Sequence, residues 1–109
     1  MERLDVEMPP AELKKRLDAG TSPRLIDVRQ QSEAQICALP GSELIPLNEI
    51  PARLDELSKD EEIVLYCHHG MRSLNAAVFL REKGFAKVKS LAGGIDYWSQ
   101  AVDPKVPRY

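Results

Sequence analysis

Short runs of apolar residues alternate along the chain with segments whose apolar residues have helical spacing. The apolar runs predict strands at residues 3–7, 25–28, 43–47, 62–66 and 88–91. The intervening segments predict helices at residues 11–17, 30–36, 51–58 and 73–83, and a last helix opened by Gly93 and Gly94. Strands that alternate with helices in this way are typical of an α/β domain. We therefore expect one domain over residues 1–109, with a central, mostly parallel sheet of about five strands and helices on both faces.

The boundaries of these elements follow from capping residues and prolines. Asn48 is a suitable N-cap for the helix at 51–58. Pro104 and Pro107 end helix formation, so residues 103–109 should form an irregular tail. In parallel sheets of this type, ligands bind beyond the carboxyl ends of the strands. Cys67, directly after the strand expected at 62–66, occupies that position.

Composition narrows the classes of function. The 109 residues are 43% hydrophobic and 29% charged, with a net charge of −2, which is ordinary for a globular protein and predicts no general nucleic-acid affinity. No apolar run approaches the length of a membrane span, and the first residues lack a secretory signal, so we expect a cytoplasmic protein without a membrane partner. Cys37 and Cys67 are the two cysteines, too few for a disulfide scaffold, and a reducing compartment would keep both as thiols.

Cys67 is the strongest candidate for chemistry. It directly follows the apolar run at 63–66 and precedes a short turn that contains Gly70 and leads into a helix. A cysteine between a strand and a helix start faces backbone N–H groups and the positive end of the helix dipole. We therefore expect an exposed thiol that is partly ionised, and the thiolate is the reactive form.

The distance along the chain from Cys67 to Arg72 separates two kinds of chemistry. Four residues lie between them. Cysteine phosphatases of the tyrosine-phosphatase type have five residues there, because their loop surrounds a whole phosphate group. A loop that is one residue shorter presents a tighter ring of N–H donors. The spacing thus favours a single terminal sulfur as the bound group.

Four separate segments together resemble the rhodanese-like (sulfurtransferase) family, over almost the whole chain. They are residues 25–29 with Glu33, the Pro40-Gly41 turn, the loop 67–73, and residues 91–95 with Trp98. One departure is the sequence before Pro40, where Cys37-Ala38-Leu39 replaces the Gly-His-Ile of many relatives. The closing residues 102–109 are also similar to the end of rhodanese domains that are fused to ubiquitin-activating-like adenylyltransferases.

The resemblance implies a two-step sulfur transfer without a metal or organic cofactor. Cys67 would take the outer sulfur from a small anion such as thiosulfate, and the resulting persulfide would pass it to cyanide or a thiol. Backbone N–H groups of the active-site loop would hold the anionic sulfur. That loop comprises His68, His69, Gly70, Met71, Arg72 and Ser73.

Several residues have a structural interpretation beside the functional one. Arg72 either attracts the anionic donor or pairs with a carboxylate and fixes the loop. His68 and His69 could tune the choice of donor, but with no further histidine they do not predict a metal site. Gly70 is expected to have a positive φ or a close backbone neighbour.

Five further residues are expected to have mainly structural roles. Asp27, at a strand end, and an Arg29–Glu33 pair beyond it are expected to support the loops around the site. Trp98 should pack in the core or at its rim. Cys37 is either a small buried apolar residue or a resolving thiol that exchanges sulfur with Cys67.

The sequence leaves the class of acceptor open. The first hypothesis is an enzyme that acts on small molecules, and the second is a persulfide carrier that delivers sulfur to a partner protein in cofactor or tRNA thiolation. A small-anion reductase or cysteine phosphatase ranks below both, because the loop is short.

Overall fold

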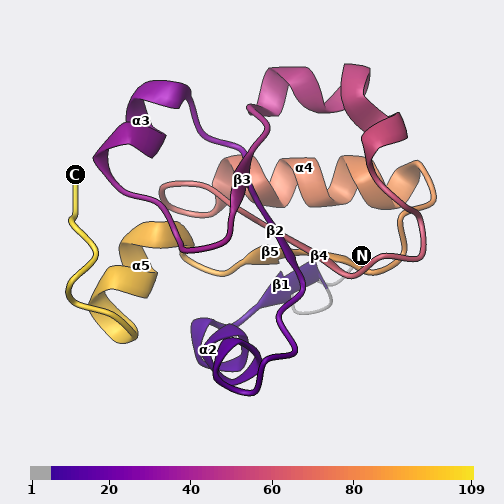
Figure 1. Cartoon of the computed structure of the whole chain (residues 1–109). Helices are drawn as coiled ribbons and strands as arrows, with labels where there is room; N and C mark the ends of the chain where they lie inside the picture. Colours follow the sequence, from indigo (N-terminus) through magenta and orange to yellow (C-terminus); the bar gives the residue numbers. More distant parts are fainter. Residues whose placement is uncertain (1–5) are drawn as a thin grey trace.

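A computed structural model of the chain describes residues 6–109 and has a five-stranded parallel sheet at its centre (Figure 1). The strand order is β1-β5-β4-β2-β3, and every pairing is parallel. The strands are β1 (Glu7–Met8), β2 (Arg24–Asp27), β3 (Glu43–Leu44), β4 (Ile63–Tyr66) and β5 (Val88–Leu91). This arrangement confirms the predicted α/β class and parallel sheet.

Strand β4 lies in the middle of the sheet because all of its side chains are apolar enough to be buried. Successive residues point to opposite faces of a strand, and β4 divides in this way between two cores. Ile63 and Leu65 belong to one apolar cluster, whereas Val64 and Tyr66 belong to the other. The end of β4 is therefore fixed on both faces.

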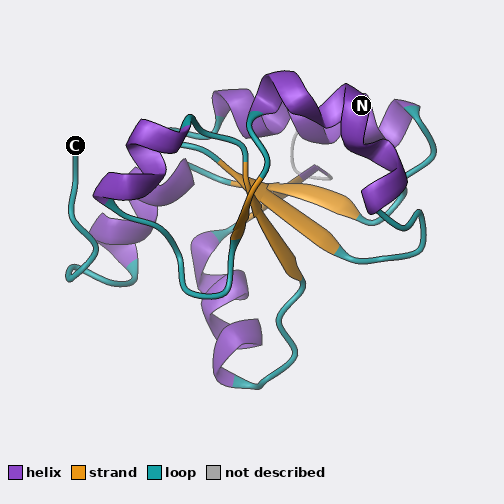
Figure 2. Ribbon diagram, turned by 45° about the horizontal axis from the view of Figure 1, so that its top comes forward, coloured by secondary structure: helices purple, strands orange, loops and turns teal. Residues whose placement is uncertain are grey.

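Helices cover both faces of the sheet, as predicted. Figures 1 and 2 show α4 and the 3₁₀ segment η1 on one face and α2 and α5 on the other, while α3 lies beyond the carboxyl ends of the strands. Their bounds are α2 (Pro10–Asp18), α3 (Gln31–Ile36), η1 (Leu47–Glu56), α4 (Met71–Glu82) and α5 (Gly94–Ala101). Among residues 6–109, none of the helices combines the length and the apolar character that a membrane span requires.

Some boundaries differ from the sequence prediction. Strand β3 is limited to Glu43–Leu44 rather than 43–47, because Pro46 leads into the 3₁₀ segment that begins at Leu47, although the N–H groups of Ile45 and Leu47 still donate to the carbonyls of Asp27 and Val28. The helix expected at 51–58 with Asn48 as its cap is instead a 3₁₀ segment that begins at Leu47 after Pro46 and contains Pro51. Residues 3–5 of the strand expected at 3–7 lie outside the described residues; of the remaining two, Glu7 begins β1, whereas Val6 is not part of a strand. Helix α4 begins two residues earlier than expected.

Candidate functional site

The Cys67 thiol is buried, with only 1% of the residue exposed, so the expectation of an exposed thiol was wrong. Cys67 follows β4 at the carboxyl edge of the sheet. It packs in the same apolar cluster as Ala76 and Ala77 of α4, whose first turns cover it. The sequence pattern indicates the strand end and the helix start, but it does not show how closely the helix returns over the sulfur.

Backbone N–H groups point at the sulfur, as the strand–turn–helix pattern predicted. The N–H of Gly70 lies 3.1 Å from Cys67 Sγ and that of Ser73 lies 3.4 Å from it. Gly70 precedes α4 with φ +101°, which confirms the predicted positive φ, and its backbone approaches that of Gly93. The loop thus presents N–H donors and a helix N-terminus to one sulfur atom.

A pair of buried serines continues this set of donors. Ser73 Oγ lies 3.5 Å from Cys67 Sγ and 2.7 Å from Ser90 Oγ, and both serines are fully buried. Ser90 comes from β5 and was not among the residues singled out in the sequence. The available signal was weak, because Ser90 is one of two polar residues in β5, next to Lys89. A chain of two hydroxyl groups can orient a proton toward an anionic sulfur.

The start of α5 holds the loop from its carbonyl side. The N–H of Ile95 donates to the carbonyl of Cys67 at 2.9 Å, and the N–H of Asp96 donates to that of His68 at 3.0 Å. A Cβ on Gly94 would collide with these same carbonyl groups. The segment around Gly93 and Gly94 therefore serves the site by allowing a helix N-terminus to approach the Cys67 loop without a side chain between them.

Arg72 pairs with Glu33 of α3 through both of its terminal nitrogens, at 2.7 and 2.8 Å. Hydrogen bonding from Arg72 lowers the pKa of Glu33 to about 2, and that from Glu33 raises the pKa of Arg72. Of the two roles expected for Arg72, the structure shows the contact with a carboxylate that fixes the loop. A role in attracting the donor stays a prediction.

Arg29 pairs with Asp27 and not with Glu33, which corrects the sequence interpretation. The fully buried guanidinium contacts both carboxylate oxygens of Asp27, at 2.8 and 2.7 Å, and donates to the Cys37 carbonyl at 2.6 Å. Arg29 reaches Glu33 at the backbone carbonyl, where Nη1 donates over a long distance of 3.4 Å. Asp27 and Arg29 thus support the segment that leads into α3, while Glu33 carries that support to the Cys67 loop.

Tyr109 joins these residues and was not predicted to do so. Its hydroxyl donates to Glu33 Oε2 at 2.8 Å and accepts from Arg29 Nη1 at 2.9 Å. Its ring stacks on that of His68, with centroids 3.8 Å apart and planes 8° apart. Burial raises the pKa of Tyr109 to about 12, so the hydroxyl keeps the proton that it donates.

The remaining loop residues differ in exposure. His68 is half-buried, and burial followed by the charge of His69 lowers its pKa. Its Nε2 atom is buried without a hydrogen-bond partner among the described residues. His69 is exposed, with Nδ1 3.8 Å from Asp96 Oδ2. Met71 is 60% exposed. Of these side chains, that of His68, the residue after Cys67, lies against the ring of Tyr109.

Trp98 and Cys37, which were both expected to have structural roles, pack on the face of the sheet opposite to Cys67. Trp98 is 4% exposed and packs in the cluster on the α2 and α5 face, as expected of a core residue. Cys37 belongs to that same cluster, whereas Cys67 belongs to the cluster on the opposite face of the sheet. This placement favours the structural interpretation of Cys37.

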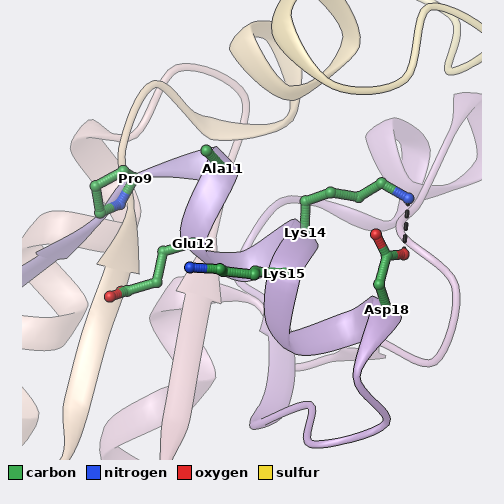
Figure 3. A pocket seen from close by; sticks show the side chains of 6 residues that line it. All are labelled: Pro9, Ala11, Glu12, Lys14, Lys15 and Asp18. Carbon is green, nitrogen blue, oxygen red and sulfur yellow. Dashed lines mark hydrogen bonds and ion pairs between the residues drawn. The ribbon is translucent and has the colours of Figure 1, made fainter.

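The hollow drawn in Figure 3 is separate from the Cys67 loop. It is lined by Pro9, Ala11, Glu12, Lys14, Lys15 and Asp18, on α2 and the turn before it. Lys14 and Asp18 form an ion pair at 2.8 Å there. None of residues 67–73 lines it, so the chemistry of the candidate site centres on a buried sulfur and not on the open hollows of the surface.

Comparisons with known proteins agree with this arrangement. The family model for a rhodanese-like domain matches residues 9–101. The putative sulfurtransferase YtwF of Bacillus subtilis is 36% identical over 91% of this chain and 95% of its own. The maize adenylyltransferase and sulfurtransferase MOCS3-2 is 38% identical over 90% of this chain, which spans 22% of that protein. The human single-domain sulfurtransferase TSTD1 superposes with a TM-score of 0.82 and 26% identity over 88% of this chain and 96% of its own. The chain therefore belongs to the family of rhodanese-like domains.

Proposed function

We propose that this protein is a sulfurtransferase that carries sulfur as a persulfide on Cys67. The donor is a thiosulfate-like anion, and the acceptor is cyanide or a thiol. The proposal assumes a reducing, cytoplasmic location, where both cysteines stay free thiols, as they are in the structure. No metal or organic cofactor takes part in it.

The observation that carries the proposal is the set of donors around Cys67 Sγ. Two backbone N–H groups and the Ser73 hydroxyl surround the sulfur within 3.5 Å, at the N-terminus of α4. Such preorganised donors are typically worth roughly 3 kcal/mol each when charge develops in a transition state. They suit a thiolate, and the remaining N–H groups of the loop suit the terminal sulfur of a persulfide.

The chemistry consists of two displacements at sulfur. In the first, the Cys67 thiolate attacks the outer sulfur of thiosulfate, and the bond between the two sulfurs of the donor breaks. Sulfite leaves with the electron pair, and Cys67 becomes a persulfide anion. In the second, cyanide or a thiolate attacks the terminal sulfur, and the Cys67 thiolate leaves. No net oxidant is consumed, and no proton has to be transferred in either displacement.

Arg72 contributes by fixing the loop in this mechanism. Its ion pair with Glu33 holds the first turn of α4 against α3, which keeps the N–H groups of Gly70 and Ser73 aimed at the sulfur. A donor anion that approaches the loop would also meet the Arg72 charge, shared with Glu33. His68 and His69 border the approach and are proposed to influence which donor is accepted.

A second candidate is a persulfide carrier whose acceptor is a protein. The maize relative that is named both adenylyltransferase and sulfurtransferase favours it, since such a fusion places a domain of this kind next to a second activity. Both candidates require the Cys67 persulfide. They differ in the second step: an enzyme for small molecules turns over cyanide rapidly, whereas a carrier is slow with cyanide and fast with a protein thiol or thiocarboxylate.

The first step is tested by mass. Incubation with thiosulfate should add one sulfur, about 32 Da, and Cys67→Ser should abolish the adduct. Cys37→Ser is the matched control and should keep it. An adduct that persists in Cys67→Ser and disappears in Cys37→Ser would show that the wrong nucleophile was chosen. Hydrolysis of an aryl phosphate without sulfur transfer would favour the phosphatase alternative.

A further inference from the structure

Residues 103–109, the tail, return from the end of α5 toward the Cys67 loop. Figure 1 shows this segment in yellow, running from α5 to a position beside α3. Ser99 Oγ donates to the carbonyl of Val106 at 2.6 Å, and Arg108 Nε donates to Asp96 Oδ1 at 2.9 Å. Asp96 is the residue whose N–H holds the His68 carbonyl. The tail is thus attached to the element that supports the loop.

Tyr109 contacts the surroundings of Cys67 through both its ring and its hydroxyl. The ring covers that of His68, the residue after Cys67. The hydroxyl is bound between Arg29 and Glu33, and the same Glu33 holds Arg72. Tyr109 therefore links α3, the start of the Cys67 loop and the first turn of α4.

These contacts differ in kind from the packing on the other sides of Cys67. Strand β4 and helix α4 enclose the sulfur through a continuous apolar core. Tyr109, in contrast, is 37% exposed, lies in an irregular segment and is held by a few polar contacts and one ring stack. Local opening follows regions with few buried apolar contacts. The contacts of Tyr109 with His68, Arg29 and Glu33 are accordingly the ones that can open at least cost.

A molecule that exchanges sulfur with Cys67 must reach an atom in a residue that is only 1% exposed. We propose that Tyr109 is a specificity-determining residue, a removable cover that sets the size of the molecules that reach Cys67. Small anions enter with a slight displacement of the ring, whereas a protein thiol requires Tyr109 to leave Arg29, Glu33 and His68. The inference rests on the proposed function only in taking Cys67 Sγ as the atom that exchanges sulfur.

The test compares small and large thiol reagents. The full chain is labelled with iodoacetamide and with a maleimide that carries a bulky dye, and labelling at Cys67 is followed by peptide mass. Tyr109→Ala should raise the rate with the bulky reagent by roughly tenfold or more, because two hydrogen bonds to charged groups and a ring stack are lost. The rate with iodoacetamide should rise by no more than about threefold, since a small reagent needs little opening.

Tyr109→Phe separates the two kinds of contact, because it keeps the ring stack on His68 and loses both hydroxyl bonds. For Tyr109→Phe, the ratio of the labelling rate with the bulky maleimide to the rate with iodoacetamide should lie between the ratios of the wild type and Tyr109→Ala. It also carries the test if Tyr109→Ala fails to fold. Tyr97→Ala, which removes another exposed ring, from α5, is the matched control and should leave the ratio unchanged.

An unchanged ratio in both Tyr109 variants would overturn the inference. So would an equal rise with both reagents, which indicates general loosening of the fold. Labelling needs no sulfur transfer, and the thiosulfate adduct is measured separately. If no thiosulfate adduct forms but the labelling ratio changes in the Tyr109 variants, the proposed function is rejected and the role of Tyr109 as a cover stands. If the adduct forms but the labelling ratio does not change, the proposed function stands and the cover is rejected.

Discussion

Arg72 and Glu33, 39 positions apart in the chain, form a two-point ion pair with N–O distances of 2.7 and 2.8 Å. The pair connects the first turn of α4 with α3, and through that turn it fixes the loop around Cys67. A planar guanidinium that meets a carboxylate at two points combines charge with a defined orientation. The contact is therefore suited to positioning as well as to stability.

We expect Glu33→Gln to lower stability in a pH-dependent way. The folded state lowers the pKa of Glu33 from 4.5 to about 2, chiefly through the hydrogen bonds from Arg72. A carboxyl group with a lowered pKa stabilises the fold above its unfolded pKa, and this contribution is lost as the pH falls through the folded pKa. Urea unfolding should show a loss on the order of 2 kcal/mol at pH 7 that shrinks below pH 4.5 and disappears near pH 2.

Glu49→Gln is the control for this prediction. Glu49 also pairs with an arginine, Arg53, but at 3.3 Å and with its side chain 49% exposed. Exposed pairs contribute about 0.2–1 kcal/mol, so the loss should be small at every pH. Equal losses in the two variants, or a loss in Glu33→Gln that does not change between pH 7 and pH 3, would contradict the role given to Glu33.

Ser90→Ala should slow formation of the Cys67 persulfide. Ser90 does not reach the sulfur itself but holds Ser73, whose hydroxyl and N–H both face it. Loss of one buried hydrogen bond is worth about 1 kcal/mol, which corresponds to a rate reduced roughly fivefold. The measurement is the rate at which the thiosulfate adduct appears.

A second buried serine provides the comparison. Ser99→Ala removes a hydroxyl that bonds to Val106, at the tail instead of the Cys67 loop. It should cost similar stability without slowing the adduct, because a looser tail, which carries Tyr109, can only ease the access of a small anion to Cys67. If the two variants slow the adduct equally, Ser90 acts through general stability and not through Ser73.

Gly94→Ala should damage the protein far more than Gly20→Ala. Both glycines have a positive φ, which alone costs about 1 kcal/mol for alanine. Gly20 has open space around it, whereas a Cβ on Gly94 would overlap the carbonyl groups of Cys67 and His68. We expect a loss above about 2 kcal/mol and a displaced Cys67 loop. Thermal unfolding and the adduct rate test this, and similar losses in both variants would disprove the proposed close approach.

Local sequence patterns were sufficient to predict the fold and the position of Cys67 between a strand and a helix start. The apolar run 63–66 indicates a strand buried on both faces, and Gly70 before a helical pattern indicates a turn with a positive φ. Both depend on residues close in sequence, whose conformational preferences act without the rest of the fold. Strand, turn and helix start therefore coincide with the structure to within a few residues.

Pairings between distant residues could not be predicted in the same way. Arg29 has both Asp27 and Glu33 close to it in the sequence, but Glu33 is paired with Arg72 of α4, a residue far along the chain, and Arg29 pairs with Asp27. The role of Ser90 depends on the register that aligns β5 with β4. Tyr109 lies 76 residues from Glu33, in a segment without periodicity. The burial of Cys67 has the same origin, because it depends on the packing of α4 over the sheet.

Oxidation should form no disulfide between Cys37 and Cys67. The two residues pack in apolar clusters on opposite faces of the sheet. The backbone carbonyl of Cys37 is also fixed by the buried Arg29 guanidinium at 2.6 Å. A disulfide needs Cα atoms within about 7 Å and suitably directed side chains, which would require Cys37 to leave its core. Mild oxidation followed by peptide mass should find no Cys37–Cys67 crosslink, and Cys37→Ala should form the thiosulfate adduct at the wild-type rate. A crosslink formed under native conditions, or a slower adduct in Cys37→Ala at unchanged stability, would instead favour a resolving thiol.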